Sequence, residues 1–151
     1  MDQETFISFL IRAKHDTYAS GRNPDASSRP SSHDLDYSEG NLKYIDTYLG
    51  GFHFIGEEAV WEGATPIWGM NYYGKMLAVD FPQGFSEFLK SALMLVPREA
   101  PYRGPASYSE GNFTFTCTWQ GELKCFQGEE EIFFSGERVY RLTFHGGEVR
   151  A

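Results

Sequence analysis

The pentapeptide Tyr37-Ser38-Glu39-Gly40-Asn41 occurs twice in this chain, and its second copy is Tyr108-Ser109-Glu110-Gly111-Asn112. The repeat continues downstream, where Gly56-Glu57-Glu58 returns as Gly128-Glu129-Glu130. A repeat of about seventy residues indicates two copies of one supersecondary unit that pack against each other. The boundary between the copies is therefore the first place to look for a functional site.

Each copy begins with a predicted helix, over residues 4–15 and 84–96. In both helices apolar side chains recur at i, i+3, i+4 and i+7, which places them on one face. The matched positions are Phe6/Phe85, Phe9/Phe88, Leu10/Leu89 and Ala13/Ala92. Asp2 is expected to cap the first helix, and Pro97 to end the second.

Four strand-like segments follow each helix, separated by turns that contain glycine. The alternation of Phe113, Phe115, Cys117 and Trp119 with threonines predicts one buried face. The strands are expected at 34–38, 42–49, 53–62 and 66–73, then at 106–109, 112–119, 123–134 and 138–145. The segment 123–134 is expected to break near Gln127-Gly128.

These elements predict the α+β class: two helix-plus-four-strand repeats with pseudo-two-fold symmetry, giving about eight antiparallel strands and two helices in one domain over 1–151. The repeats span 4–74 and 84–147. A longer polar linker at 18–33 distinguishes the first copy, and we expect either a mobile surface loop or a lid there. Both an open saddle and a closed barrel fit this pattern.

Composition limits the classes of function. The 151 residues are 41% hydrophobic and carry a net charge of −8, which disfavours direct nucleic-acid binding and anionic membranes. No apolar run approaches the roughly twenty residues that span a bilayer, and no signal peptide is evident, so we expect a cytoplasmic protein. Cys117 and Cys125 are then expected to be buried free thiols.

No strong catalytic signature is present. The sequence lacks Gly-x-Ser-x-Gly, His-Glu-x-x-His, Cys-x-x-Cys and a complete Gly-x-x-x-x-Gly-Lys-[Ser/Thr] loop. Common hydrolases, zinc enzymes and nucleotide-triphosphate enzymes are therefore disfavoured, and we expect no cofactor and no bound metal.

Weaker groups of residues remain. Arg29 with neighbouring serines can clamp a carboxylate or phosphate, and His33 can act as an acid–base group. Alternatively, these residues only cap and turn a loop. Asn71 and His145 lie where the two copies differ in chemistry, and a structural role is the alternative for both.

Asp46 is the most informative mismatch, because it occupies the position of Cys117 on an aromatic inward face. A buried carboxylate needs a hydrogen-bonding partner, either a tyrosine hydroxyl or an arginine such as Arg103. Burial would raise its pKa, as in a general base. Alternatively, this face is partly solvated.

The repeated Gly-Glu-Glu places one glutamate on each side of its strand, because side chains alternate. Glu58 and its counterpart in the second copy can then hold a divalent cation or form an acid–base pair. A solvated charged face is the alternative.

The chain resembles a bacterial domain family of unknown function over almost its whole length. The runs that carry the resemblance are Phe9–Lys14, Ser28–Pro30 with His33–Leu35, Tyr48–Gly51, Phe54–Glu58, Trp68–Gly74, Pro101–Pro105, Phe126–Gly128 and Phe144–Gly147. Members of that family stand alone or follow an Xre-type helix-turn-helix. The resemblance therefore implies a sensor role and gives no catalytic residues.

We expect a cytoplasmic small-molecule-binding module with an aromatic cleft between the repeats. Its predicted walls are Tyr44, Tyr48, Trp68, Tyr72 and Trp119, and its predicted polar contacts are Arg29, His33, Asp46 and Arg103, with Glu58, Asn71 and His145 as further candidates. One alternative is a small hydrolase or isomerase that pairs Asp46 or Glu58 with His33. A second alternative is a protein-interaction module, and a homodimer is compatible with each.

Overall fold

The computed structural model describes residues 1–17, 19 and 27–151. Half of the predicted loop or lid at 18–33, namely residues 18 and 20–26, lies outside these residues. The elements in chain order are α1 (Gln3–Asp16), β1 (His33–Glu39), β2 (Leu42–Gly50), β3 (His53–Glu62), β4 (Thr65–Met76), α2 (Phe85–Leu93), β5 (Ser107–Glu110), β6 (Phe113–Glu122), β7 (Cys125–Phe134) and β8 (Glu137–Glu148).

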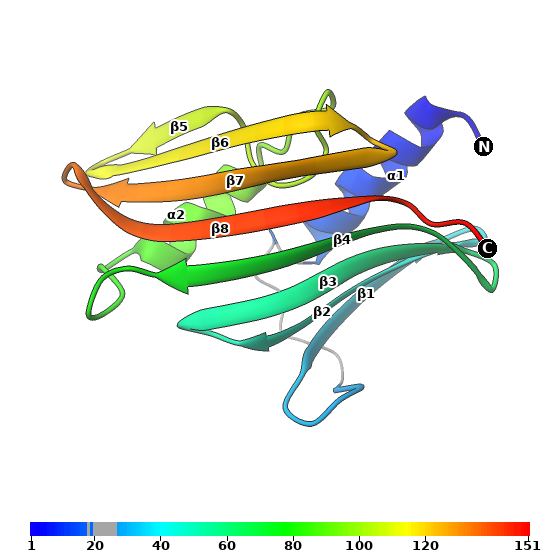
Figure 1. The fold of residues 1–151 in the computed structure, drawn as a ribbon, viewed down its shortest axis with the longest axis horizontal. Coiled ribbons are helices and arrows are strands. Elements are labelled where there is room, and N and C mark those ends of the chain that lie inside the picture. The colour runs from blue at the N-terminus through cyan, green and yellow to red at the C-terminus, as the bar shows by residue number, and fades with distance from the viewer. Residues whose placement is uncertain (18, 20–26) are drawn as a thin grey trace.

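The predicted α+β class is confirmed. All eight strands form one antiparallel sheet in the order β1-β2-β3-β4-β8-β7-β6-β5, so the two four-stranded halves meet where β4 pairs with β8. Figure 1 shows both helices on the same face of this curved sheet. The sheet is open, with β1 and β5 at its edges, which decides between the saddle and the barrel.

The helix ends follow local chemistry. Asp2 caps α1 as predicted, because its carboxylate accepts the Thr5 N–H at 2.9 Å. The second helix was expected to reach residue 96, but it ends at Leu93. The reason is that the amides of Leu95 and Val96 bond three residues back, which tightens the chain into turns before Pro97.

The expected break in the third strand of the second copy is wrong. The strand β7 runs through Gly128 without interruption, and its irregularity lies at Ile132/Phe133. Gly128 has a packing role instead, because a Cβ there would overlap the ring of Phe144. A glycine within a strand can thus mark a close approach rather than an end.

The aromatic core repeats with the sequence. In the first copy the Phe54 ring lies over Gly74 and contacts the rings of Tyr72 and Tyr140. In the second copy, Phe126 lies over Gly146 and contacts Phe144 and Trp68, which are the residues that match Tyr72 and Tyr140. The pseudo-two-fold therefore extends to side-chain packing.

The two cysteines differ in environment. Cys117 is buried, and burial, aided by the charge of Glu130, raises the pKa of its thiol to about 12. The expectation that Cys125 is also buried is wrong, because this residue is exposed on the opposite face at the start of β7. Both thiols are free.

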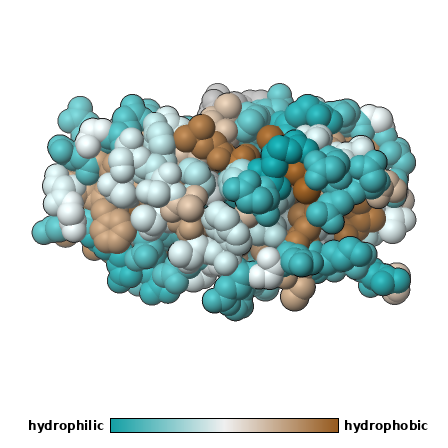
Figure 2. Space-filling model, turned by 90° about the horizontal axis from the view of Figure 1, so that it is seen from above, coloured by the Kyte–Doolittle hydropathy of each residue, from teal (hydrophilic) through white to brown (hydrophobic). Residues whose placement is uncertain are grey.

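Seen from the side on which β5 lies, hydrophobic residues form narrow patches between hydrophilic ones (Figure 2). Across the part of the chain that the structure describes, no helix is long and apolar enough to cross a membrane.

Candidate functional site

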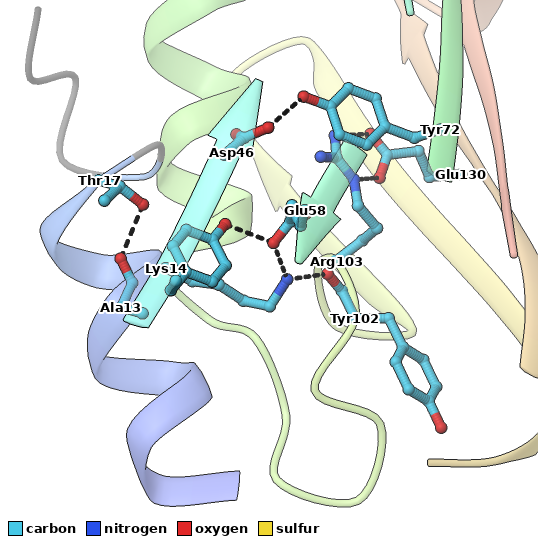
Figure 3. A network of polar contacts seen from close by, with 10 residues as sticks. Ala13, Lys14, Thr17, Asp46, Glu58, Tyr72, Tyr102, Arg103 and Glu130 are labelled. Atoms are coloured by element: carbon cyan, nitrogen blue, oxygen red, sulfur yellow. Dashed lines mark hydrogen bonds and ion pairs between the residues drawn. The ribbon is translucent and has the colours of Figure 1, made fainter. Parts of the chain in front are cut away.

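A cluster of charged and tyrosine side chains lies between the sheet and α1, and we call it the buried polar centre (Figure 3). Its members all bury their polar groups on the helix-facing side of the sheet, and they are Lys14, Tyr44, Asp46, Glu58, Tyr72, Arg103, Glu130 and Tyr140. Buried charges are stable only when they are paired and hydrogen-bonded. The contacts within this cluster meet that requirement.

Glu58 is the acceptor in the first copy. The ammonium of Lys14 donates to Glu58 Oε1 at 2.5 Å and to the carbonyl oxygen of Tyr102 at 2.7 Å. The Tyr44 hydroxyl donates to the same carboxylate oxygen. Burial lowers the pKa of Lys14, while the adjacent Glu58 charge opposes this shift. The ion pair joins α1 to β3.

Glu130 is the equivalent acceptor in the second copy. Arg103 binds it in a two-pronged arrangement, with Nε donating to Oε1 at 2.7 Å and Nη2 to Oε2 at 2.9 Å. The Tyr140 hydroxyl completes the shell at 2.7 Å. The Arg103 guanidinium also lies 5.5 Å from the centre of the Tyr72 ring, so the cation of one copy packs on an aromatic ring of the other.

Asp46 is buried, with only 2% of its surface exposed, so the partly solvated alternative does not hold. Its partner is a tyrosine, because the Tyr72 hydroxyl donates to Oδ1 at 2.6 Å, whereas Arg103 pairs with Glu130. The missing side chain of Gly56 leaves the space that this hydroxyl occupies. Burial, reinforced by the charge of Glu58, raises the pKa of Asp46 to about 7.

The protonated form of Asp46 balances the charge of the buried polar centre. Two cations, Lys14 and Arg103, are each paired with a glutamate, which leaves Asp46 as the one carboxyl group in excess. In the second copy the positions of Asp46 and Tyr72 are occupied by Cys117 and Phe144. These two side chains cannot form the hydrogen bond that joins Tyr72 to Asp46. The polar pair is therefore a property of one copy, whereas the ion pairs are common to both.

A groove lies beside this cluster, between α2 and strands β2 to β4, and we call it the aromatic groove. It encloses about 290 Å³. Six aromatic side chains line it together with Met76, Leu89, Ser86 and Lys90. The aromatic residues are Tyr48, Phe52, Phe54, Tyr72, Phe81 and Phe85. Tyr72 thus has its ring in the groove wall and its hydroxyl on Asp46.

The structure brings three of the predicted residues together at the groove. Tyr48 and Tyr72 line it, and the His33 ring packs on Tyr48 with 4.9 Å between ring centres. Tyr44, Asp46, Glu58 and Arg103 lie in the buried polar centre instead.

The other predicted residues are dispersed. Trp68 is packed in the core, where its indole N–H donates to the Leu123 carbonyl. Asn71 and His145 face each other on the exposed side of the sheet. Trp119 and His145 line a separate shallow hollow, and Arg29 is exposed. The described ranges contain no group of three His, Cys, Asp or Glu side chains placed to hold a metal ion.

The carboxylate of Glu130 was expected as the counterpart of Glu58, but sequence reasoning missed Lys14 and Tyr140 in the buried polar centre. In the aromatic groove it missed Phe52, Phe54, Phe81, Phe85, Ser86 and Lys90. One signal was available for Lys14, because it lies eight residues after Phe6 and so continues the apolar face of α1. A lysine on such a face indicates a buried carboxylate opposite it. The groove residues come from separate elements, and only the fold brings them together.

A family model described as Domain of unknown function (DUF5680) matches residues 46–149. The match begins at Asp46 within β2 and covers β3, β4, the helix α2 and all of the second copy. No curated protein and no solved structure matches the chain.

We expect Lys14→Met to destabilise the fold by about 3–5 kcal/mol, because it leaves the Glu58 carboxylate buried without its cation. Arg12→Met is the matched control on the same helix. Arg12 pairs with Glu39 at the surface, where such pairs contribute about 1 kcal/mol or less. Urea unfolding of both variants gives the comparison, and equal losses would contradict the importance of the buried pair.

We expect the stability of Asp46→Asn relative to the wild type to rise by about 2–4 kcal/mol between pH 4 and pH 7. The folded protein holds a proton on Asp46 up to about pH 7, whereas the unfolded chain loses it near pH 3.8. Asp46 therefore makes its full contribution to stability at pH values below its pKa in the unfolded chain. This contribution decreases as the pH rises towards its pKa in the folded protein.

Urea unfolding at several pH values measures this difference. The double variant Asp46→Cys/Tyr72→Phe copies the second repeat and provides the control, which should fold and show the same relative trend. A difference from the wild type that stays constant from pH 4 to pH 7 would show that Asp46 does not hold a proton in the folded protein.

Proposed function

The chain belongs to the DUF5680 family, and from the geometry of this member we propose that it is a small-molecule-binding module whose site is the aromatic groove. The observation that carries the proposal is the groove itself: a concave surface lined by six aromatic side chains, two of them tyrosines, with the Ser86 hydroxyl and the Lys90 ammonium group. Ligand sites in proteins are mostly apolar clefts with a few polar groups that orient the ligand.

The position of Tyr72 supports a sensor role. A ligand in the groove contacts the ring whose hydroxyl binds Asp46 and whose face carries Arg103. Arg103 in turn holds Glu130 in the other half of the sheet. A contact in the groove is therefore one residue away from the Arg103–Glu130 ion pair of the second copy, through the packing of Arg103 on the Tyr72 ring.

We further propose that this sensor operates in the cytoplasm, alone or as a homodimer, and reports to a DNA-binding partner of the helix-turn-helix class. The family resemblance supports the DNA-binding partner. The net charge of −8 supports a separate DNA-binding unit, because this chain repels phosphate.

An acid–base enzyme is the second candidate, and one observation favours it. A carboxyl group with a pKa of about 7, as at Asp46, suits a general base at neutral pH. The substrate would have to displace Tyr72 to reach this buried group. The binding role needs no such rearrangement, and we therefore prefer it.

A thermal-shift screen with small metabolites tests the binding role. Ligands that bind the folded state raise Tm, and Ser86→Trp should abolish these shifts because the indole fills the groove. Glu87→Trp is the matched control on the same helix, since this side chain lines a different hollow. Shifts that survive Ser86→Trp, or a broad library that gives none, would contradict binding in the groove.

A further inference from the structure

We propose that the aromatic groove binds a small aromatic acid, whose ring stacks on Phe54 and whose carboxylate pairs with Lys90. This inference rests on the binding role proposed above and names the class of ligand. It follows from a comparison of the groove with its counterpart in the second copy.

The counterpart lies between α1 and the β6–β7 hairpin. Gly121, Glu122 and Leu123 line it where Gly50, Gly51 and Phe52 line the groove of the first copy. Helix α1 supplies Ile7 at the position that Ser86 has in α2. The two hollows are therefore the same place in the repeat.

In the second copy a ring of the chain's own covers Phe126, and a hollow of about 760 Å³ remains beside that ring. The Tyr102 ring stacks on Phe126 with 3.8 Å between ring centres and 11° between their planes. Tyr102 is six residues before Tyr108 of the shared pentapeptide, and the residue six before Tyr37 is Ser31, which has no ring. Phe54, the match of Phe126, has no ring stacked on it in this way among the described residues.

The matched phenylalanines differ in how deeply they are buried. Phe126 is only 4% exposed under Tyr102, whereas Phe54 is only partly buried. Both phenylalanine rings contact a glycine of the next strand and have matching neighbouring rings. The first copy is thus shaped for an aromatic ring that the described residues do not supply there.

The charge of the groove lining indicates which polar group the ligand carries beside its ring. Among the described residues, Lys90 is the one charged side chain in the lining, and no hydrogen bond or ion pair links its ammonium group to another of them. The Ser86 hydroxyl is one turn away on the same helix. A ring with a carboxylate matches this arrangement, because an ammonium group at an apolar surface attracts an anion.

The size of the groove sets an upper limit on the ligand. Its volume of about 290 Å³ is at the lower end of the range of roughly 300–1,000 Å³ found for ligand pockets. A ligand of one or two fused rings is compatible with that volume.

Calorimetric titration with matched naphthalene probes tests the proposal. We expect 2-naphthoate to bind more tightly than neutral 2-naphthamide, and cationic 2-naphthylmethylammonium to bind least. Lys90→Met should weaken 2-naphthoate about three- to tenfold and leave 2-naphthamide unchanged. Lys75→Met, on the exposed face of the sheet, is the matched control and should leave the affinities unchanged.

A second variant tests the stacking. Phe54→Leu keeps an apolar side chain but removes the ring, so it should weaken both 2-naphthoate and 2-naphthamide. Circular dichroism of each variant establishes that the fold is retained.

The outcomes separate this inference from the binding role. Equal binding of 2-naphthoate and 2-naphthamide, both abolished by Ser86→Trp, would contradict the proposal that the ligand is an acid. The groove would remain a binding site. Metabolites that bind in the groove where no naphthalene probe does would overturn the aromatic class. If neither probes nor metabolites bind, both proposals fall.

Discussion

Two buried carboxylates, Glu58 and Glu130, set the constraint on which the structure depends. Each occupies the same position in its copy and would be strongly destabilising without a cation. Lys14 of α1 satisfies the first, and Arg103 of the connection after α2 satisfies the second. The helices and connections must therefore take positions that bring these cations to the sheet. Apolar packing around Phe54 and Phe126 then holds the two halves of the sheet together.

The duplication separates what the fold needs from what one copy has added. Both copies keep a glutamate and a phenylalanine lying over a glycine at matched positions. Each glutamate also binds a cation and a tyrosine hydroxyl, which come from positions that do not match. The first copy alone has the Tyr72–Asp46 bond, and the second alone has Tyr102 on Phe126. A scaffold interaction is expected in both copies, so these two differences identify where function has diverged.

The sequence predicted the class, the repeat and much of the chemistry of Asp46, because each depends on local pattern or on comparison of the two copies. It identified Asp46 as a carboxyl group on an aromatic face, with a tyrosine hydroxyl as a possible partner and a raised pKa. It did not distinguish Tyr72 from Arg103 as that partner, since the choice depends on the space left by Gly56 in the next strand.

The aromatic groove was beyond sequence reasoning for a similar reason. Its residues come from three strands, two connections and a helix, and their meeting depends on how α2 crosses the sheet. The exposed position of Cys125 and the early end of α2 also depend on packing and on the turns before Pro97. The sequence pattern indicates which face of a helix or strand is buried. Which other element packs against that face depends on the complete fold.

A crystal structure of Tyr102→Ala soaked with 4-bromophenol, beside the soaked wild type, is the most direct measurement. The bromine gives an anomalous signal that locates each ring. We predict one ring on Phe54 in the wild type, and rings on both Phe54 and Phe126 in the variant, where the ligand replaces the deleted side chain. A ring on Phe126 of the variant with none on Phe54 in either protein would contradict it.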